Sequence, residues 1–168
     1  MIHPTALVDS RAQIDPTAEI GPYVVIDGPA VIGPRVRVLA HAQIAGKVTV
    51  GAGTLIGRAA IIGSEPQDLG FVPGTDSEVV IGQDNKIHEH VTIHRGSKNG
   101  GVTRIGDRNF LMVGAHLAHD VVLGDQNVIA NAALLAGHIH VGNNTFIGGS
   151  AVFHQFLRIG DFCVVQGN

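Results

Sequence analysis

The chain has 168 residues, a formal net charge of −3 and one cysteine, Cys163. This slightly negative balance offers no field that would attract a phosphate backbone, so nucleic acid is not an expected partner. One cysteine excludes a disulfide framework, and no stretch approaches the roughly 18 consecutive apolar residues of a membrane span. We therefore expect one domain in a cytoplasmic protein without an integral membrane segment.

A repeat of six residues begins at the N-terminus. An aliphatic residue stands at every sixth position from Ile2 to Ile62. A small or branched residue recurs four places after it, as at Ala6, and glycine often follows it directly, as at Gly51. Glycine accepts a positive φ or a close backbone approach, so these glycines are expected at corners of the chain.

Two segments, 64–80 and 94–104, interrupt the repeat. The period continues between them from Ile81 to Ile93, and after them from Ile105 to Val165. Both interruptions are polar and contain glycine or proline, which predicts loops that leave the repeating scaffold. Loops on a rigid scaffold often carry binding residues, although a tolerated insertion would look the same.

The period of six predicts a parallel β-helix. A 3.6-residue helix and a plain two-residue alternation both fail to maintain this pattern, whereas short strands joined by turns every six residues do maintain it. Three repeats would close a triangular coil, with residues 18 apart stacked about 4.8 Å from one another. We expect an all-β fold over residues 1–168 with three short strands per coil. A β-sandwich of short strands is the alternative, but it does not require a strict period.

Stacking by 18 residues gathers polar side chains on one corner of this prism. It places His119 below Gly137 and Gly137 below Gln155, and it places Asp120 below His138. Two further histidines fall close by, His116 and His154. The spacing therefore predicts a cluster of imidazoles, a carboxylate and an unobstructed backbone amide.

Such a cluster suits acyl transfer to a hydroxyl. Histidine accepts and returns a proton near neutral pH, and the carboxylate of Asp120 could orient the ring of His119. The N–H of Gly137 could stabilise a tetrahedral oxyanion. Histidines on solenoid corners can also form polar ladders without any chemistry, and the spacing alone leaves that reading open.

The repeat resembles that of the hexapeptide-repeat acyltransferases, whose coils are triangular and left-handed. The resemblance covers essentially the whole chain. Four segments, 91–96, 116–120, 135–138 and 154–156, resemble the UDP-N-acetylglucosamine acyltransferases, which begin lipid A biosynthesis. Four such segments in this order are a specific signal, whereas any one of them is weak.

The resemblance implies roles for individual residues. His119 would deprotonate the 3-hydroxyl of the sugar, Asp120 would orient His119, and the amide of Gly137 would stabilise the oxyanion. Gly167 falls where the family sets acyl length, and a glycine there leaves room for a longer chain. The resemblance implies that substrates are held by the following residues: Gln67, Asp68, His116, His138, Gly149, His154 and Gln155.

The resemblance also implies partners and departures. Acyl carrier protein would deliver a (3-hydroxy)acyl group to UDP-N-acetylglucosamine, and the assembly would be a homotrimer. No metal or separate cofactor is expected, because acyl-phosphopantetheine enters as part of the donor. Gly70 stands where the family usually has a lysine, and the sequence stops at Asn168 without the family's C-terminal helical domain.

Three other functions compete with this one. The first is an N-acyltransferase of the same scaffold that acts on acylated UDP-glucosamine. The second is a zinc carbonic anhydrase with three histidine ligands across a trimer interface, although the spacing of His116 and His119 is shorter than in that family. The third is an inactive sugar-nucleotide binding module.

Overall fold

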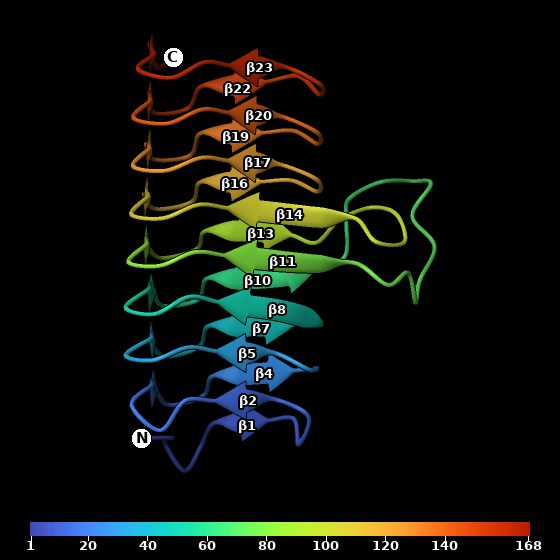
Figure 1. Ribbon diagram of the computed structural model, residues 1–168, viewed down its shortest axis with the longest axis vertical. Coiled ribbons are helices and arrows are strands. Elements are labelled where there is room, and N and C mark those ends of the chain that lie inside the picture. Colours follow the sequence, from blue (N-terminus) through green and yellow to red (C-terminus); the bar gives the residue numbers. More distant parts are fainter.

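The computed structural model describes residues 1–168 and contains 24 strands and no helix. The strands form three parallel sheets of eight strands each, and every third strand along the chain belongs to the same sheet. The chain thus climbs one coil for every three strands, from the N-terminal end to the C-terminal end (Figure 1). The predicted all-β, left-handed parallel β-helix with three short strands per coil is confirmed.

The three sheets are the three faces of the prism. Face 1 consists of β1 (Leu7–Val8), β4 (Val25–Asp27), β7 (Gln43–Ala45), β10 (Ile61–Ser64), β13 (Thr92–His94), β16 (His116–Leu117), β19 (Leu134–Leu135) and β22 (Val152–Phe153). Face 2 consists of β2 (Gln13–Ile14), β5 (Val31–Ile32), β8 (Lys47–Val50), β11 (Glu78–Ile81), β14 (Val102–Ile105), β17 (Val122–Leu123), β20 (His140–Val141) and β23 (Arg158–Ile159). Face 3 consists of β3 (Glu19–Ile20), β6 (Arg37–Val38), β9 (Leu55–Ile56), β12 (Lys86–Ile87), β15 (Phe110–Leu111), β18 (Val128–Ile129), β21 (Phe146–Ile147) and β24 (Val164–Val165).

The interior of the prism is a column of aliphatic side chains. In most coils the aliphatic residue of the repeat is fully buried and the residue before it points outward, as Ile44 and Gln43 do in β7. The small residue four places later, such as Ala60, is buried as well. Each coil buries its apolar side chains against the coils above and below it, so stability depends on neighbouring coils.

The corners use left-handed backbone at residues other than glycine. Fifteen such residues have a positive φ, and from Arg108 to Phe162 they recur every six residues, with Gly114 in the series. This conformation costs about 1–3 kcal/mol for a residue with a side chain. The structure offsets this cost because the corner N–H donates to the coil below, as His138 N–H does to the carbonyl of His119 at 3.1 Å.

The glycines that directly follow the aliphatic residue allow successive coils to approach closely. Gly51 has no positive φ, and a methyl group on it would lie 2.5 Å from the carbonyl carbon of Gly82 in the next coil. Close approach between coils therefore requires these glycines. Of the two expected reasons for glycine, close backbone approach is therefore the one that applies to most of them, and the left-handed residue comes two positions later.

The two interruptions of the repeat leave the prism at one edge. Residues 65–77 connect β10 to β11, and residues 95–101 connect β13 to β14, so both cross from face 1 to face 2. They project together from the same side of the prism (Figure 1). None of the chain forms a helix of the length and apolarity that crossing a bilayer requires.

Candidate functional site

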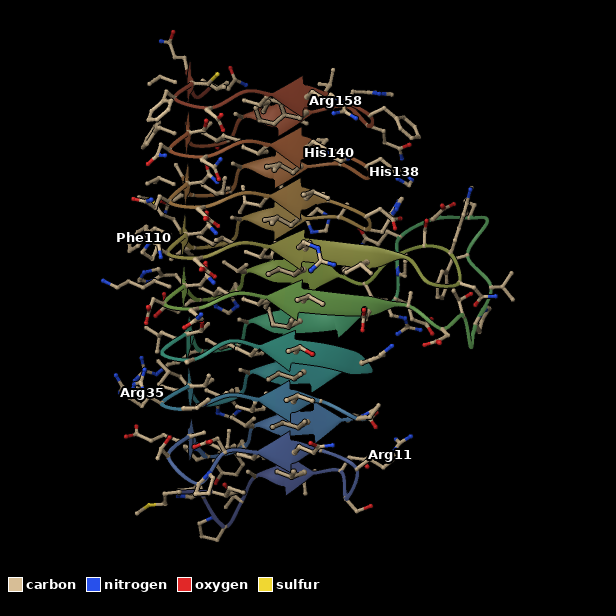
Figure 2. The ribbon with its side chains drawn as sticks, in the orientation of Figure 1. Arg11, Arg35, Phe110, His138, His140 and Arg158 are labelled. Carbon is tan, nitrogen blue, oxygen red and sulfur yellow. The ribbon has the colours of Figure 1, made fainter.

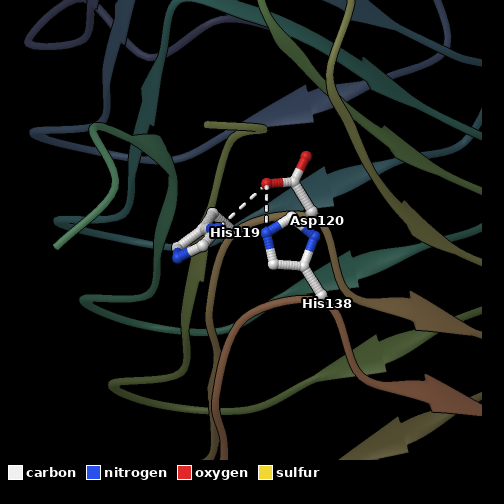
Figure 3. Close-up of side chains that lie close together, drawn as sticks. All are labelled: His119, Asp120 and His138. Carbon is white, nitrogen blue, oxygen red and sulfur yellow. Dashed lines mark hydrogen bonds and ion pairs between the residues drawn. The ribbon is translucent and has the colours of Figure 1, made fainter. Parts of the chain in front are cut away.

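His119 and Asp120 lie at the edge between face 1 and face 2, directly after β16. The repeat gives Asp120 a left-handed backbone with φ of 59°, and His119 is 4% exposed. His119 Nδ1 lies 2.9 Å from Asp120 Oδ2, and Figure 3 shows the imidazole directed at this oxygen. The second ring nitrogen, Nε2, has no hydrogen bond within the chain. The carboxylate thus holds one side of the imidazole and leaves the other side free to accept a proton.

The carboxylate of Asp120 is fixed by the 95–101 loop. Ser97 donates to Asp120 Oδ2 twice, from its hydroxyl at 2.6 Å and from its backbone N–H at 3.0 Å. The N–H of Asp120 donates to Thr103 Oγ1 at 2.8 Å. Burial by itself raises the pKa of Asp120, but the hydrogen bonds from Ser97 and His119 outweigh it, and the pKa lies below its ordinary value. Asp120 is therefore an anion that stabilises a protonated His119.

His138 stands on the next coil, above Asp120. Its Nε2 lies 3.8 Å from Asp120 Oδ2, and its ring meets that of His119 edge-on, with centroids 5.1 Å apart (Figure 3). On its other side the ring of Phe156 stacks in parallel at 4.7 Å. Figure 2 shows His138 at the edge from which the loops project. This stacking fixes the ring of His138 beside the His119–Asp120 pair.

Gly137 lies beside the ring of His119 and must be a glycine. A methyl group on Gly137 would lie 2.4 Å from His119 Cε1 and 2.6 Å from Nε2. The N–H of Gly137 donates to no acceptor within the chain. A free donor therefore lies next to the free nitrogen of His119, which is the pair of groups that a tetrahedral acyl-transfer intermediate requires.

His119 and Gly137 open into one cleft of about 210 Å³ on face 1. Its polar side chains come from His116, His119, Gln155 and the loop residue Gln67. Its apolar wall consists of Ala118, Leu134, Ala136, Val152 and Phe153. A site with a proton acceptor at one end and an apolar wall at the other can accept a polar nucleophile and an apolar chain together.

His116 lines this cleft in a neutral state. Its Nδ1 lies 2.7 Å from the hydroxyl of Thr92, and its ring meets that of His94 edge-on at 4.9 Å. Burial, followed by the charge of His119, lowers the pKa of His116. Burial also lowers the pKa of His94 to about 4, with smaller contributions from His116 and His119. Both rings therefore act as neutral hydrogen-bonding groups near neutral pH.

Comparison with known proteins identifies the scaffold. A family model described as the GMPPB C-terminal domain matches residues 2–96, more than half of the chain, and by this match the N-terminal coils belong to that family of domains. The crystal structure of UDP-N-acetylglucosamine O-acyltransferase from Moraxella catarrhalis is 44% identical, with a TM-score of 0.96, and covers 99% of the chain. By sequence and fold, the chain is similar to the UDP-N-acetylglucosamine O-acyltransferases.

Other UDP-N-acetylglucosamine O-acyltransferases show the same likeness. The acyl-[acyl-carrier-protein]–UDP-N-acetylglucosamine O-acyltransferase of Myxococcus xanthus is 52% identical over 120 residues, which are 71% of this chain and 46% of that protein. The Arabidopsis UDP-N-acetylglucosamine acyltransferase structure is 34% identical, with a TM-score of 0.87. The chain spans 65% of the Moraxella structure and 66% of the Arabidopsis structure, which is less than two thirds of either.

The structure brings five of the eleven expected residues into the lining of the cleft, namely Gln67, His116, His119, Gly137 and Gln155, while Asp120 and His138 lie behind it against His119. Asp68 is exposed and accepts a hydrogen bond from the N–H of Gly70 at 2.8 Å, within its own loop. His154 is exposed on the coil above Ala136. Neither Asp68 nor His154 lines the cleft.

Gly149 and Gly167 lie on a different edge of the prism, between face 3 and face 1. They stack on each other, and a methyl group on Gly167 would lie 2.5 Å from the carbonyl oxygen of Gly149. Coil packing alone is therefore a sufficient reason for glycine at position 167. Neither residue lines the cleft of His119.

A metal centre at this site would have to use His119, Asp120 and His138, whose nearest ligand atoms lie within 4.8 Å of one another. The donors around Asp120 Oδ2 argue against it. Ser97 directs a hydroxyl and an N–H at this oxygen, and a cation in the same place would meet both protons. The arrangement fits a carboxylate that orients histidines better than a carboxylate that binds zinc.

Sequence reasoning missed three contributors to the site. Ser97 lies in the interruption that was expected to loop out, but its partner Asp120 is 23 residues away. Phe156 belongs to the 154–156 segment, where only its neighbours were assigned roles. Arg95 was noticed only as part of the 91–96 segment. For Arg95 and Phe156 the signal was membership of segments that carry the family resemblance, whereas for Ser97 it was only the position in a polar interruption of the repeat.

Proposed function

We propose that this chain transfers a (3-hydroxy)acyl group from acyl carrier protein to the 3-hydroxyl of UDP-N-acetylglucosamine, the first step of lipid A biosynthesis. One observation carries the proposal. His119 is hydrogen-bonded to Asp120 through Nδ1. Its Nε2 has no hydrogen-bond partner in the chain and lies at the cleft beside Gly137, whose N–H also lacks an acceptor. Similarity to the UDP-N-acetylglucosamine O-acyltransferases supports the substrate class.

The chemical step uses the residues as follows. His119 Nε2 takes the proton of the sugar hydroxyl while the hydroxyl oxygen forms a bond to the thioester carbonyl carbon. The Gly137 N–H stabilises the resulting oxyanion, and Asp120 stabilises the imidazolium. The intermediate then breaks its carbon–sulfur bond, and the departing thiol of the phosphopantetheine arm takes the proton from His119. The products are an ester and free carrier-protein thiol, so no further cofactor is needed.

The remaining residues bind the two substrates. Gln67, His116 and Gln155 surround the polar part of the cleft and would hydrogen-bond the sugar. Leu134, Val152 and Phe153 form the apolar wall along which the acyl chain would lie. His138, with its Nε2 directed at Asp120, would help to order the acceptor end of the cleft. Asp68 and His154 are exposed nearby and would contact the sugar nucleotide or the pantetheine arm.

A homotrimer would explain why Gly149 and Gly167 lie away from the cleft of their own subunit. Face 1 carries exposed apolar side chains beside the cleft, including Val152 at 72% exposure and Leu134 at 41%. Another subunit packed against this face would close the cleft and bring its own Gly149 and Gly167 edge toward the acyl chain. In such an assembly Gly149 would border the donor groove and Gly167 would set acyl length. We propose that this assembly works in the cytoplasm, where carrier-protein thioesters are made.

The direct test is incubation of the protein with UDP-N-acetylglucosamine and a panel of acyl carrier protein thioesters, followed by mass spectrometry. We expect an acylated sugar nucleotide. His119→Ala should lower kcat by about 10²–10⁴-fold, which is the usual contribution of a general base. The matched control is His140→Ala, because His140 is exposed on face 2, away from the cleft (Figure 2). Normal turnover by His119→Ala, or no product with any thioester, would refute the proposal.

A further inference from the structure

The 65–77 loop places Gln67 at the cleft, although few residues of this loop are buried against the rest of the protein. Within this loop only Pro66 and Ser77 are buried, and residues 67–70 are all exposed. Segments with few buried contacts open at low free energy. A contact outside the loop is therefore needed to keep Gln67 beside His119.

Arg95 makes such contacts with loop residues that precede and follow Gln67 in the sequence. Its Nη2 lies 3.1 Å from Glu65 Oε1, and its guanidinium carbon lies 5.3 Å from the centre of the Phe71 ring. Its Nη1 donates to the carbonyl oxygen of Gly63 at 3.5 Å. One side chain thus contacts the start and the middle of the loop, and Gln67 lies between these contacts.

The far end of the loop is held by other groups. The N–H of Asp76 donates to Asn99 Oδ1 at 3.0 Å, and the N–H of Gly100 donates to the carbonyl of Asp76 at 2.8 Å. At the start of the loop, by contrast, the backbone N–H of Arg95 donates to the carbonyl of Ser64 at 3.1 Å. The end near Glu78 is therefore fixed by the neighbouring loop, while the part that carries Gln67 depends on the side chain of Arg95.

Arg95 is placed for this purpose by the coil. Thr92 pairs with His116 in the register of face 1, so Arg95 lies one coil below His119. Its side chain is only 13% exposed, and its buried Nε has no acceptor within the protein. An unpaired buried donor destabilises the fold. The planar guanidinium of arginine pairs with a carboxylate and at the same time covers an aromatic ring. The ammonium group of lysine does not reproduce this combination.

We infer that Arg95 is a positioning residue that clamps the 65–77 loop over the cleft and thereby sets the affinity for the sugar-nucleotide acceptor. The inference rests on the proposed function for the identity of the acceptor. Arg95 touches neither substrate. It acts through Gln67, and its loss lowers acceptor binding while the His119–Asp120 pair stays intact.

The experiment has two measurements, one of which needs no activity. Calorimetry with UDP-N-acetylglucosamine gives the acceptor Kd, and limited digestion with chymotrypsin, which cleaves after Phe71 and the exposed Leu69, gives the opening of the loop. Arg95→Ala should raise Kd by about tenfold, or about 1.4 kcal/mol, and raise the cleavage rate by a similar factor. Turnover should show a raised acceptor KM with kcat within about twofold.

Matched variants separate clamping from general destabilisation. Arg37→Ala breaks an exposed ion pair with Glu19 far from the loop and should change neither measurement. Arg95→Lys should restore part of the affinity. Glu65→Gln should act in the same direction as Arg95→Ala, and the double variant should be no worse than Arg95→Ala alone.

Two results would overturn the inference: an unchanged cleavage rate in Arg95→Ala, or faster cleavage with an unchanged Kd. If the wild-type protein binds no UDP-N-acetylglucosamine, the proposed function fails and the role of Arg95 in acceptor affinity fails with it. The cleavage rates of Arg95→Ala and Arg37→Ala would still decide whether Arg95 holds the loop, so the two failures are distinguishable.

Discussion

Gly137→Ala tests the geometry of the site without removing any of its chemical groups. Gly137 does not have a positive φ, so its backbone accepts alanine, and the variant keeps the N–H proposed to stabilise the oxyanion. The new methyl group would lie 2.4 Å from His119 Cε1. Ordinary contact begins about 1 Å farther away, so the imidazole has to move by about that distance.

This movement disrupts the proposed proton transfer. His119 Nδ1 lies 2.9 Å from Asp120 Oδ2, and a shift of about 1 Å stretches that hydrogen bond beyond its normal range. A displacement of this size in a catalytic group costs about 100-fold in rate. We therefore expect kcat of Gly137→Ala to fall by about 100-fold, with a smaller change in the acceptor KM.

The assay is turnover with a carrier-protein thioester and UDP-N-acetylglucosamine, together with the thermal unfolding midpoint. Gly160→Ala is the matched control, because the nearest atom to its new methyl group is Cys163 Sγ at 3.9 Å. The double variant Gly137→Ala/His119→Ala should be no slower than His119→Ala alone, since both changes act through one imidazole. A Gly137→Ala protein that keeps kcat within twofold of wild type would refute this reasoning.

Two further outcomes concern stability. Gly51→Ala should lower the free energy of unfolding by about 1–3 kcal/mol, because its methyl group would meet the backbone of Gly82 at 2.5 Å, and chemical denaturation beside Gly160→Ala measures the difference. His94 has a folded-state pKa of about 4 against an ordinary value of 6.5, so the unfolded chain takes up the proton first. The contribution of neutral His94 to stability should therefore be complete above pH 6.5 and decline as the pH falls toward 4. The measurement is the unfolding midpoint as a function of pH. A His94→Gln variant with the same decline would contradict this assignment.

The repeat made the scaffold predictable because burial enforces it at every coil. Aliphatic residues such as Ile44 and Leu117 must face the interior, and a spacing of six leaves a triangular coil as the simplest closure. Stacking by 18 residues then gives the neighbours of His119 directly, since Gly137 and Gln155 occupy the same position on successive coils. The residues of the cleft that follow this rule could be named in advance.

The residues that break the rule could not be named from the repeat. Ser97, Arg95 and Gln67 reach the site through the two loops, and no period relates a loop residue to the coil that it contacts. Periodicity also could not separate the edge of His119 from the edge of Gly149 and Gly167 by function, because both are corners built in the same way.

The sequence by itself thus determined the architecture and the stacked histidine edge, because each depends on a local pattern repeated at a constant interval. The tertiary structure alone decided which atoms of that edge are free. It shows Asp120 held by Ser97, the Nε2 of His119 left open beside the N–H of Gly137, and the Gln67 loop clamped by Arg95. These contacts depend on the path of irregular segments through space, which side-chain packing determines and a one-dimensional period does not encode.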